Sequence, residues 1–191
     1  MKSIIFSIIL FTSVSSFAQN FEMDGTEIGF DLAFNASTNG GNAGIGLKYG
    51  INFGESLIVG PSARYERTWI KNNVTGINGG YNVYGGGVFG HYRFQNVLFA
   101  GVEFEMLKSP YTKIGQLTSL PSWAPILFLG GGFSREFNES FRINAGIMYD
   151  VINAENSPFK RSYNFTVKNE QGQVVKILPI IFRLAFFIPL S

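Results

Sequence analysis

Apolar and polar residues alternate along much of this chain, most regularly between positions 42 and 53. The apolar positions in this stretch are Ala43, Ile45, Leu47, Tyr49, Ile51 and Phe53, and the positions between them hold Asn, Gly or Lys. A period of two places successive side chains on opposite faces of a β-strand. The pattern therefore predicts a strand whose two faces meet different surroundings.

The same two-sided pattern returns about eight times between Gly25 and Leu190. Strands are expected at 25–36, 42–54, 57–69, 81–94, 97–108, 123–137, 141–151 and 178–188. Short turns alternate with long polar loops, which is typical of transmembrane barrels with short periplasmic turns and long outer loops. The sequence predicts an all-β fold, a transmembrane antiparallel up-and-down β-barrel of eight strands. A barrel of ten strands remains an alternative if the longest loop, 153–175, contains two further strands. We expect instead that this loop forms a hairpin turning at 170–172, outside the membrane.

The first 18 residues have the features of a secretory signal peptide. Lys2 precedes an apolar core at 4–11, and Ser16, Phe17 and Ala18 place small residues where signal peptidase cleaves. A membrane-spanning helix needs roughly 18 to 20 apolar residues, far more than this core offers. We expect a signal peptide at 1–18, a mature barrel at 19–191, and a location in the outer membrane of a Gram-negative bacterium after cleavage.

Composition narrows the class of protein further. The chain holds 23 Gly, 20 Phe and 8 Tyr, and only 15% of its residues are charged, against about 25% in average proteins. Glycine relieves crowding inside a small barrel, and aromatic residues form girdles at membrane interfaces. The absence of Cys excludes disulfides and thiolate chemistry. A net charge of +2 without a basic cluster gives no sign of nucleic-acid binding.

Six ionisable residues share the face that we expect to point into the barrel. They are Asp31, Lys48, Arg64, Glu103, Glu105 and Arg183. A charge facing lipid at the bilayer centre costs about 2–4 kcal/mol, so the strand register should turn them inward. Three acids and three bases predict a lumen ion-pair network, with Asp31 meeting Lys48 or Arg183 and Arg64 meeting Glu103 or Glu105. Such a network either fills the lumen structurally or lines a gated ion path.

With these features the chain resembles the small outer-membrane barrels typified by the OmpA transmembrane domain and OmpX. The resemblance covers residues 25–190 and rests on strand number, loop asymmetry and the balanced lumen charges. It implies a lumen plugged by ion pairs. It also implies a role as a structural anchor, an adhesion or evasion surface, or a very narrow pore.

The sequence offers little for catalysis. His91 is the single histidine and is followed by Tyr92 and Arg93. Barrels that edit lipid acyl chains use a His and a Ser two residues apart, and no Ser lies near His91. The glycine runs 85–87 and 130–132 lack the Lys-Ser/Thr ending of a phosphate-binding loop. We expect no enzymatic activity, no metal and no cofactor, and we expect His91 to lie at an interface or in the lumen.

The longest loop carries a cationic and aromatic set. Its members are Phe159, Lys160, Arg161, Tyr163 and Phe165. These side chains suit a polysaccharide, a lipopolysaccharide phosphate or a protein partner, although an ordinary solvated hairpin is also consistent with them. The function expected from the sequence is a non-enzymatic scaffold or surface-binding subunit in contact with outer-membrane lipid and lipopolysaccharide. The alternatives are a small porin-like or gated pore and, less well supported because the inward face is charged, a soluble ligand-holding barrel. The oligomeric state is left open.

Overall fold

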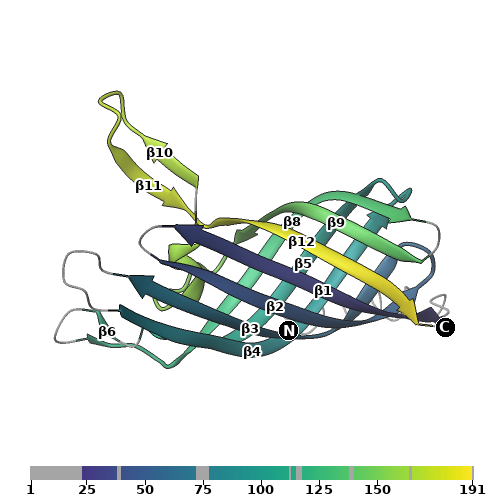
Figure 1. The fold of residues 1–191 in the computed structure, drawn as a ribbon. Helices are drawn as coiled ribbons and strands as arrows, with labels where there is room; N and C mark the ends of the chain where they lie inside the picture. The colour runs from purple at the N-terminus through teal and green to yellow at the C-terminus, as the bar shows by residue number, and fades with distance from the viewer. Residues whose placement is uncertain are drawn as a thin grey trace, which may run out of the picture.

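Eight antiparallel strands close into a barrel in the computed structural model of the chain (Figure 1). The structure describes residues 23–37, 40–71, 78–111, 113–114, 118–137, 140–163 and 165–190. The barrel strands are β1 (Met23–Ser37), β2 (Gly40–Phe53), β3 (Leu57–Lys71), β4 (Asn78–Phe94), β5 (Leu98–Lys108), β8 (Trp123–Phe137), β9 (Phe141–Asp150) and β12 (Ile180–Leu190). Each strand pairs with its neighbour along the barrel sequence, and β12 pairs with β1 to close the ring. The predicted all-β, up-and-down barrel of eight strands is confirmed. The expected signal peptide and the turn at 138–139 lie outside the described residues.

The shorter elements belong to the long loops. Strands β6 (Lys113–Ile114) and β7 (Thr118–Ser119) form one small hairpin, and β10 (Phe165–Lys168) and β11 (Val174–Leu178) form another. A 3₁₀ turn, η1 (Pro158–Arg161), precedes the second hairpin. Among the described residues, β10 and β11 pair with each other and add no strand to the barrel, so the count of eight holds and the ten-strand alternative is wrong.

The two ends of the barrel differ as the sequence predicts. The β6–β7 and β10–β11 hairpins lie at one end, here called the loop end, and the β10–β11 hairpin rises past the rim (Figure 1). At the opposite turn end, Gln95 and Asn96 have φ of 48° and 56°, and Val97 N donates to Phe94 O over 3.0 Å. Positive φ at both central residues is the geometry of a two-residue hairpin turn that matches strand twist.

Side chains alternate across the wall. On β2, Leu47 and Tyr49 are 46% and 45% exposed on the outside, and Lys48 between them is 2% exposed in the interior. The outer surface of the barrel is therefore apolar and the lumen carries charge. Among the described residues, no helix combines the length and the apolar character that crossing a bilayer requires.

Gly87 marks a place where β4 and β5 approach too closely for a side chain. A Cβ atom on Gly87 would lie 1.7 Å from the carbonyl oxygen of Phe104, whereas a Cβ on Gly90 would meet only Val102 Cγ1, at 3.7 Å. We expect Gly87→Ala to destabilise the barrel by about 1–3 kcal/mol or more, because the two strands must separate. Urea unfolding in lipid vesicles measures this. Gly90→Ala is the control, and equal unfolding midpoints for the two variants would contradict the expectation.

Candidate functional site

Asp31 is the centre of a buried cluster of charges in the lumen. Lys48 Nζ donates to Asp31 Oδ2. Arg64 Nη2 and Arg183 Nη1 lie 3.2 Å and 3.4 Å from the same oxygen. Asp31 is 1% exposed, so three cations stabilise a carboxylate that water does not reach. The sequence predicted that Asp31 meets Lys48 or Arg183, and the structure places both of these side chains beside it.

The other two acids complete the cluster. Glu103 lies 3.0 Å from Lys48 Nζ and 3.1 Å from Arg183 Nη2. Glu105 accepts two hydrogen bonds from Arg64, at 2.7 Å and 2.8 Å. Each of the six residues is at most 6% exposed. Because three acids face three bases, the set is neutral as a whole, which reduces the large penalty for burying charge.

His91 joins this cluster from β4. Its Nε2 lies 2.9 Å from Glu103 Oε1, and the residue is 1% exposed. The ring also packs between Phe89, Phe99 and Phe187, with centroid separations of 5.2 to 5.9 Å. The histidine is therefore a buried lumen residue held by one carboxylate and three aromatic rings.

A second set of ion pairs closes the turn end, and the sequence analysis missed it. Arg93 binds Glu27 through two hydrogen bonds of 2.8 Å and 2.6 Å, and Asn52 donates to the same carboxylate over 3.0 Å. Arg142 pairs with Glu136. Strand parity was the available signal, because Glu27 shares the face of Asp31 and Arg93 shares the face of His91.

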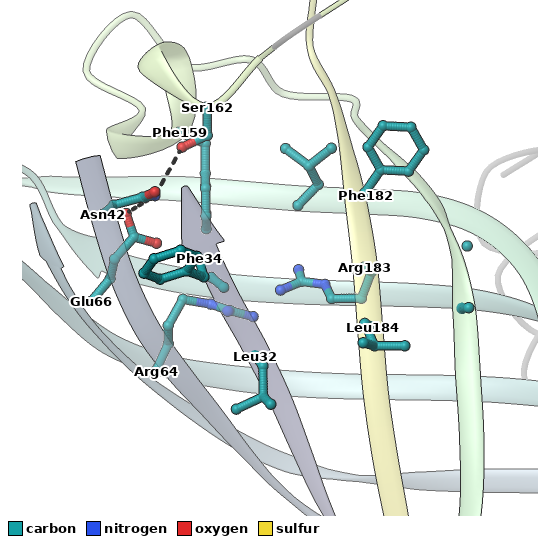
Figure 2. Close-up of a pocket in the computed structure, with 14 residues that line it drawn as sticks. Leu32, Phe34, Asn42, Arg64, Glu66, Phe159, Ser162, Phe182, Arg183 and Leu184 are labelled. Atoms are coloured by element: carbon teal, nitrogen blue, oxygen red, sulfur yellow. Dashed lines mark hydrogen bonds between the residues drawn. The ribbon is translucent and has the colours of Figure 1, made fainter. Parts of the chain in front are cut away.

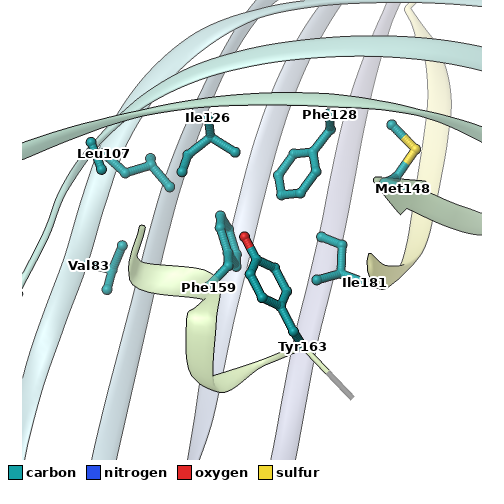
Figure 3. Packing of buried hydrophobic residues seen from close by; sticks show 9 residues of the cluster. Val83, Leu107, Ile126, Phe128, Met148, Phe159, Tyr163 and Ile181 are labelled. Carbon is teal, nitrogen blue, oxygen red and sulfur yellow. The ribbon is translucent and has the colours of Figure 1, made fainter. Parts of the chain in front are cut away.

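Residues 156–159 and Tyr163 are buried at the loop end of the lumen; we call the segment that contains them, 151–163, the plug (Figure 3). Phe159 and Tyr163 are 5% and 8% exposed and pack against inward-facing apolar residues of the wall. The wall residues in this cluster are Val83, Leu107, Ala124, Ile126, Phe128, Met148 and Ile181. The rings of Phe128 and Phe159 meet edge to face at 5.3 Å. The lumen therefore has an apolar layer above the charged one.

Hydrogen bonds hold the plug in its conformation. Tyr163 Oη donates to Asp150 Oδ2 over 2.7 Å and lies 3.2 Å from Ser157 Oγ. Ser157 Oγ also accepts from Phe159 N at the start of η1. Burial, aided by the Asp150 carboxylate, raises the pKa of the Tyr163 hydroxyl above its ordinary value, so the phenol keeps its proton and remains a donor.

Asn156 fastens the plug to the neighbouring loop. Its Nδ2 donates to the carbonyl oxygens of Pro121 and Trp123 over 2.7 Å and 3.0 Å, and Ser109 Oγ donates to its backbone oxygen. Asn156 is 5% exposed, and these contacts satisfy its side-chain amide donors and its backbone carbonyl. The plug is consequently part of the packed interior and not a free loop.

The structure divides the loop surface expected from the sequence. Phe159 and Tyr163 lie inside the barrel, Lys160 is exposed, and Phe165 is half-buried with its ring 5.3 Å from Phe182 on the outer wall. Arg161 ends η1. The expectation of one exposed surface needs correction for the two buried rings, because the apolar lumen above the charged layer accommodates them.

Within the described ranges, no three His, Asp or Glu side chains are grouped as a metal-ion site would require.

Comparisons with known proteins return structural similarity alone. No family model and no curated protein matches this chain. The chain is similar to the Yersinia pestis outer membrane protein Ail in a phospholipid bilayer nanodisc, with 15% identity and a TM-score of 0.45 over 87% of this chain and 100% of that one. It is also similar to Yersinia pestis Ail, the attachment invasion locus protein, in complex with the heparin analogue sucrose octasulfate, with 16% identity and a TM-score of 0.38 over 86% and 93%.

Proposed function

We propose that the chain is an integral outer-membrane protein whose closed barrel anchors the β10–β11 hairpin, which binds a protein partner outside the cell. The outer wall supports the membrane location. Phe182, Val88 and Leu32 are 72%, 56% and 54% exposed, and a water-soluble protein rarely exposes large apolar surfaces of this kind. Outer-membrane lipid and lipopolysaccharide would cover this wall.

The filled lumen supports an anchor in preference to a pore. The charged cluster around Asp31 and the plug around Phe159 occupy successive layers of the interior. An eight-stranded barrel is narrow enough for side chains to fill most of its interior. An ion crossing the axis would have to displace both layers, so this geometry gives no support to the porin-like alternative.

The hairpin is the observation on which the binding proposal depends. Val167, Val174, Val175 and Ile177 are 42%, 53%, 60% and 52% exposed, on two strands that stand beyond the rim (Figure 1). Among the described residues, β10 and β11 hydrogen-bond to one another as a separate two-stranded sheet. Their outer edges are therefore available for strand addition, a common mode of peptide recognition. Exposed aliphatic residues favour a protein partner over a polysaccharide.

The test compares hairpin variants expressed in the native membrane. Val175→Ser with Ile177→Ser removes aliphatic contacts and leaves the barrel unchanged. We expect recovery of the co-purified partner in mild detergent to fall by about tenfold or more, since each aliphatic side chain buried at an interface contributes about 1.5–3 kcal/mol. Glu170→Ser, an exposed change in the same hairpin, is the matched control and should retain the partner.

Two results would contradict the proposal. Equal partner recovery from all three proteins would remove the hairpin as the binding element. Release of the wild-type protein by carbonate washing, together with an electrophoretic mobility that heating does not shift, would show that it is not a membrane-embedded barrel.

A further inference from the structure

The seam between β1 and β12 opens before either strand ends. Their pairing runs from Thr26↔Leu190 to Asp31↔Ala185 and stops there. Both strands continue, β1 to Ser37 beside β2 and β12 from Ile180 beside β9. The same register would place Leu32 opposite Leu184 and Phe34 opposite Phe182, yet the strands form no pairs at these described positions. Backbone groups left unpaired inside a bilayer are costly.

A cavity of about 520 Å³ occupies this gap and reaches from the outer wall into the lumen (Figure 2). Its outer part is apolar, and its inner part is polar. The outer residues are Leu32, Phe34, Phe182 and Leu184, and the inner ones include Asn42, Arg64, Glu66 and Arg183. The volume lies within the range of small-molecule sites. An apolar mouth and a charged inner end match the two ends of an amphiphile.

Arg183 provides the specific recognition group. The residue is 6% exposed; its Nη1 and Nη2 atoms lie 3.4 Å from Asp31 and 3.1 Å from Glu103, whereas its buried Nε has no hydrogen-bond acceptor. Figure 2 shows its guanidinium extending from β12 into the cavity towards Arg64. A buried donor without an acceptor destabilises a structure, and a carboxylate oxygen accepts a charge-assisted hydrogen bond from a guanidinium N–H. The Nε–H of Arg183 is therefore a place in the cavity where an acidic oxygen can bind.

Glu66 restricts the kind of anion. It is 4% exposed, lines the same cavity and accepts a hydrogen bond of 2.8 Å from Asn42. A second acidic group repels a head group with two negative charges more than one with a single charge. A single carboxylate is also a smaller head group than a phosphate.

We propose that the β1–β12 gap is a side opening that binds a long-chain fatty acid from the surrounding bilayer, with its carboxylate on Arg183 and its alkyl chain on Leu32, Phe34, Phe182 and Leu184. This inference rests on the proposed membrane location. Phe159 and Ser162 of the plug segment line the same cavity, so the bound acid also contacts the segment that leads into the β10–β11 hairpin. The site would thus connect the lipid phase to the surface element.

The test uses palmitate carrying a photoreactive diazirine and the full chain in phosphatidylcholine vesicles. We expect the label on residues 32–34 and 182–184, and about tenfold weaker labelling by the matching hexadecanol, which lacks the charge that Arg183 recognises. A diazirine-bearing phosphatidate is the third probe. Label spread evenly around the wall, equal labelling by palmitate and hexadecanol, or stronger seam labelling by phosphatidate would each overturn the proposal.

A reversible closure of the gap gives a second, independent readout. The chain contains no Cys, so Leu32→Cys with Leu184→Cys places the only two thiols across the gap. We expect oxidation of this variant to lower palmitate labelling by about tenfold relative to its reduced form. Ile28→Cys with Ile188→Cys, at a paired position of the same seam, is the control in which oxidation should change nothing. Equal labelling of the oxidised and reduced gap variant would overturn the proposal; if the thiols do not join, the label map and the hexadecanol comparison decide.

The hairpin proposal is tested separately. Val175→Ser with Ile177→Ser should keep palmitate labelling unchanged while losing the protein partner. A failure of fatty-acid binding therefore leaves partner binding intact, and the reverse holds as well.

Discussion

Replacing Lys48 by Met destabilises the barrel by about 3–5 kcal/mol, the usual penalty for removing one partner of a buried ion pair. Lys48 lies between Asp31 and Glu103 and is 2% exposed. Methionine keeps most of the chain length and removes the charge, so three acids then face two bases. Neither carboxylate can turn to water to recover the loss.

Urea unfolding in lipid vesicles, followed by the fluorescence of Trp69 and Trp123, measures this change. The control is Lys168→Met, an exposed lysine on β10, which should alter the free energy of unfolding by no more than about 0.5 kcal/mol. A wild-type unfolding free energy for Lys48→Met would mean that the charges are solvated and that the cluster does not hold the barrel together.

The double variant Lys48→Met with Asp31→Asn separates charge balance from packing. It leaves Glu103 and Glu105 facing Arg64 and Arg183, so the cluster is again neutral. We expect its destabilisation to be smaller than the sum of the two single changes by about 0.5–3 kcal/mol, the range found for residues in one network. Strict additivity would contradict the idea that these groups act as one balanced set.

The sequence predicted the strands well because an apolar outer wall around a charged lumen imposes strict alternation. The expected strand at 123–137 coincides with β8, and the assignment of Lys48 to the interior and Leu47 to the exterior is correct. A shift by one residue would place Lys48 on the apolar outer wall, so few alternative registers are compatible with the sequence. The same reasoning placed the six ionisable residues on one face, where the structure shows them together.

The plug was not predicted because the order of residues within 151–163 shows no period. Phe159 and Tyr163 in a polar loop resemble a binding surface, and the correct interpretation depends on what they meet. Leu107, Ile126 and Phe128 face inward near the loop end, and such apolar residues would not be stable in a water-filled lumen. Strand alternation places these three residues on the inward face, and this was the available sign that another apolar segment covers them.

The open seam was beyond sequence reasoning for a different reason. Leu32, Phe34, Phe182 and Leu184 follow the same alternation as the residues of paired strands. Whether the first and last strands stay paired depends on barrel closure and stagger, which involve all eight strands. The local pattern of apolar and polar residues contains no information on this geometry of the whole barrel.

Replacing Phe159 by Ala releases the plug. The ring packs on Phe128 at 5.3 Å and lies under the Arg64 guanidinium, 5.7 Å from its Cζ. Truncating a buried Phe costs about 3–5 kcal/mol, which is large beside the hydrogen bonds of Tyr163 and Asn156 that would remain. We therefore expect local opening of 151–163 while the barrel wall stays folded.

Trypsin reports that opening because Lys160 and Arg161 lie within η1. We expect cleavage after these residues in reconstituted vesicles to become about 100-fold faster in Phe159→Ala, since cleavage follows the population of the open form. Phe165→Ala, which truncates a half-buried ring outside the lumen, is the control and should have little effect on this cut. Equal cleavage rates for wild type and Phe159→Ala would mean that the ring does not hold the plug.

Planar-bilayer recordings of the same variant distinguish the plug from the charged layer as the seal. The cluster of Asp31, Lys48, Glu103, Arg64 and Arg183 lies nearer the turn end and keeps its ion pairs when Phe159 is truncated. We expect Phe159→Ala to remain non-conducting, because an ion would still have to break a balanced set of buried pairs. A steady conductance in this variant alone would make the plug the gate of a pore and would remove the closed anchor from the proposed function.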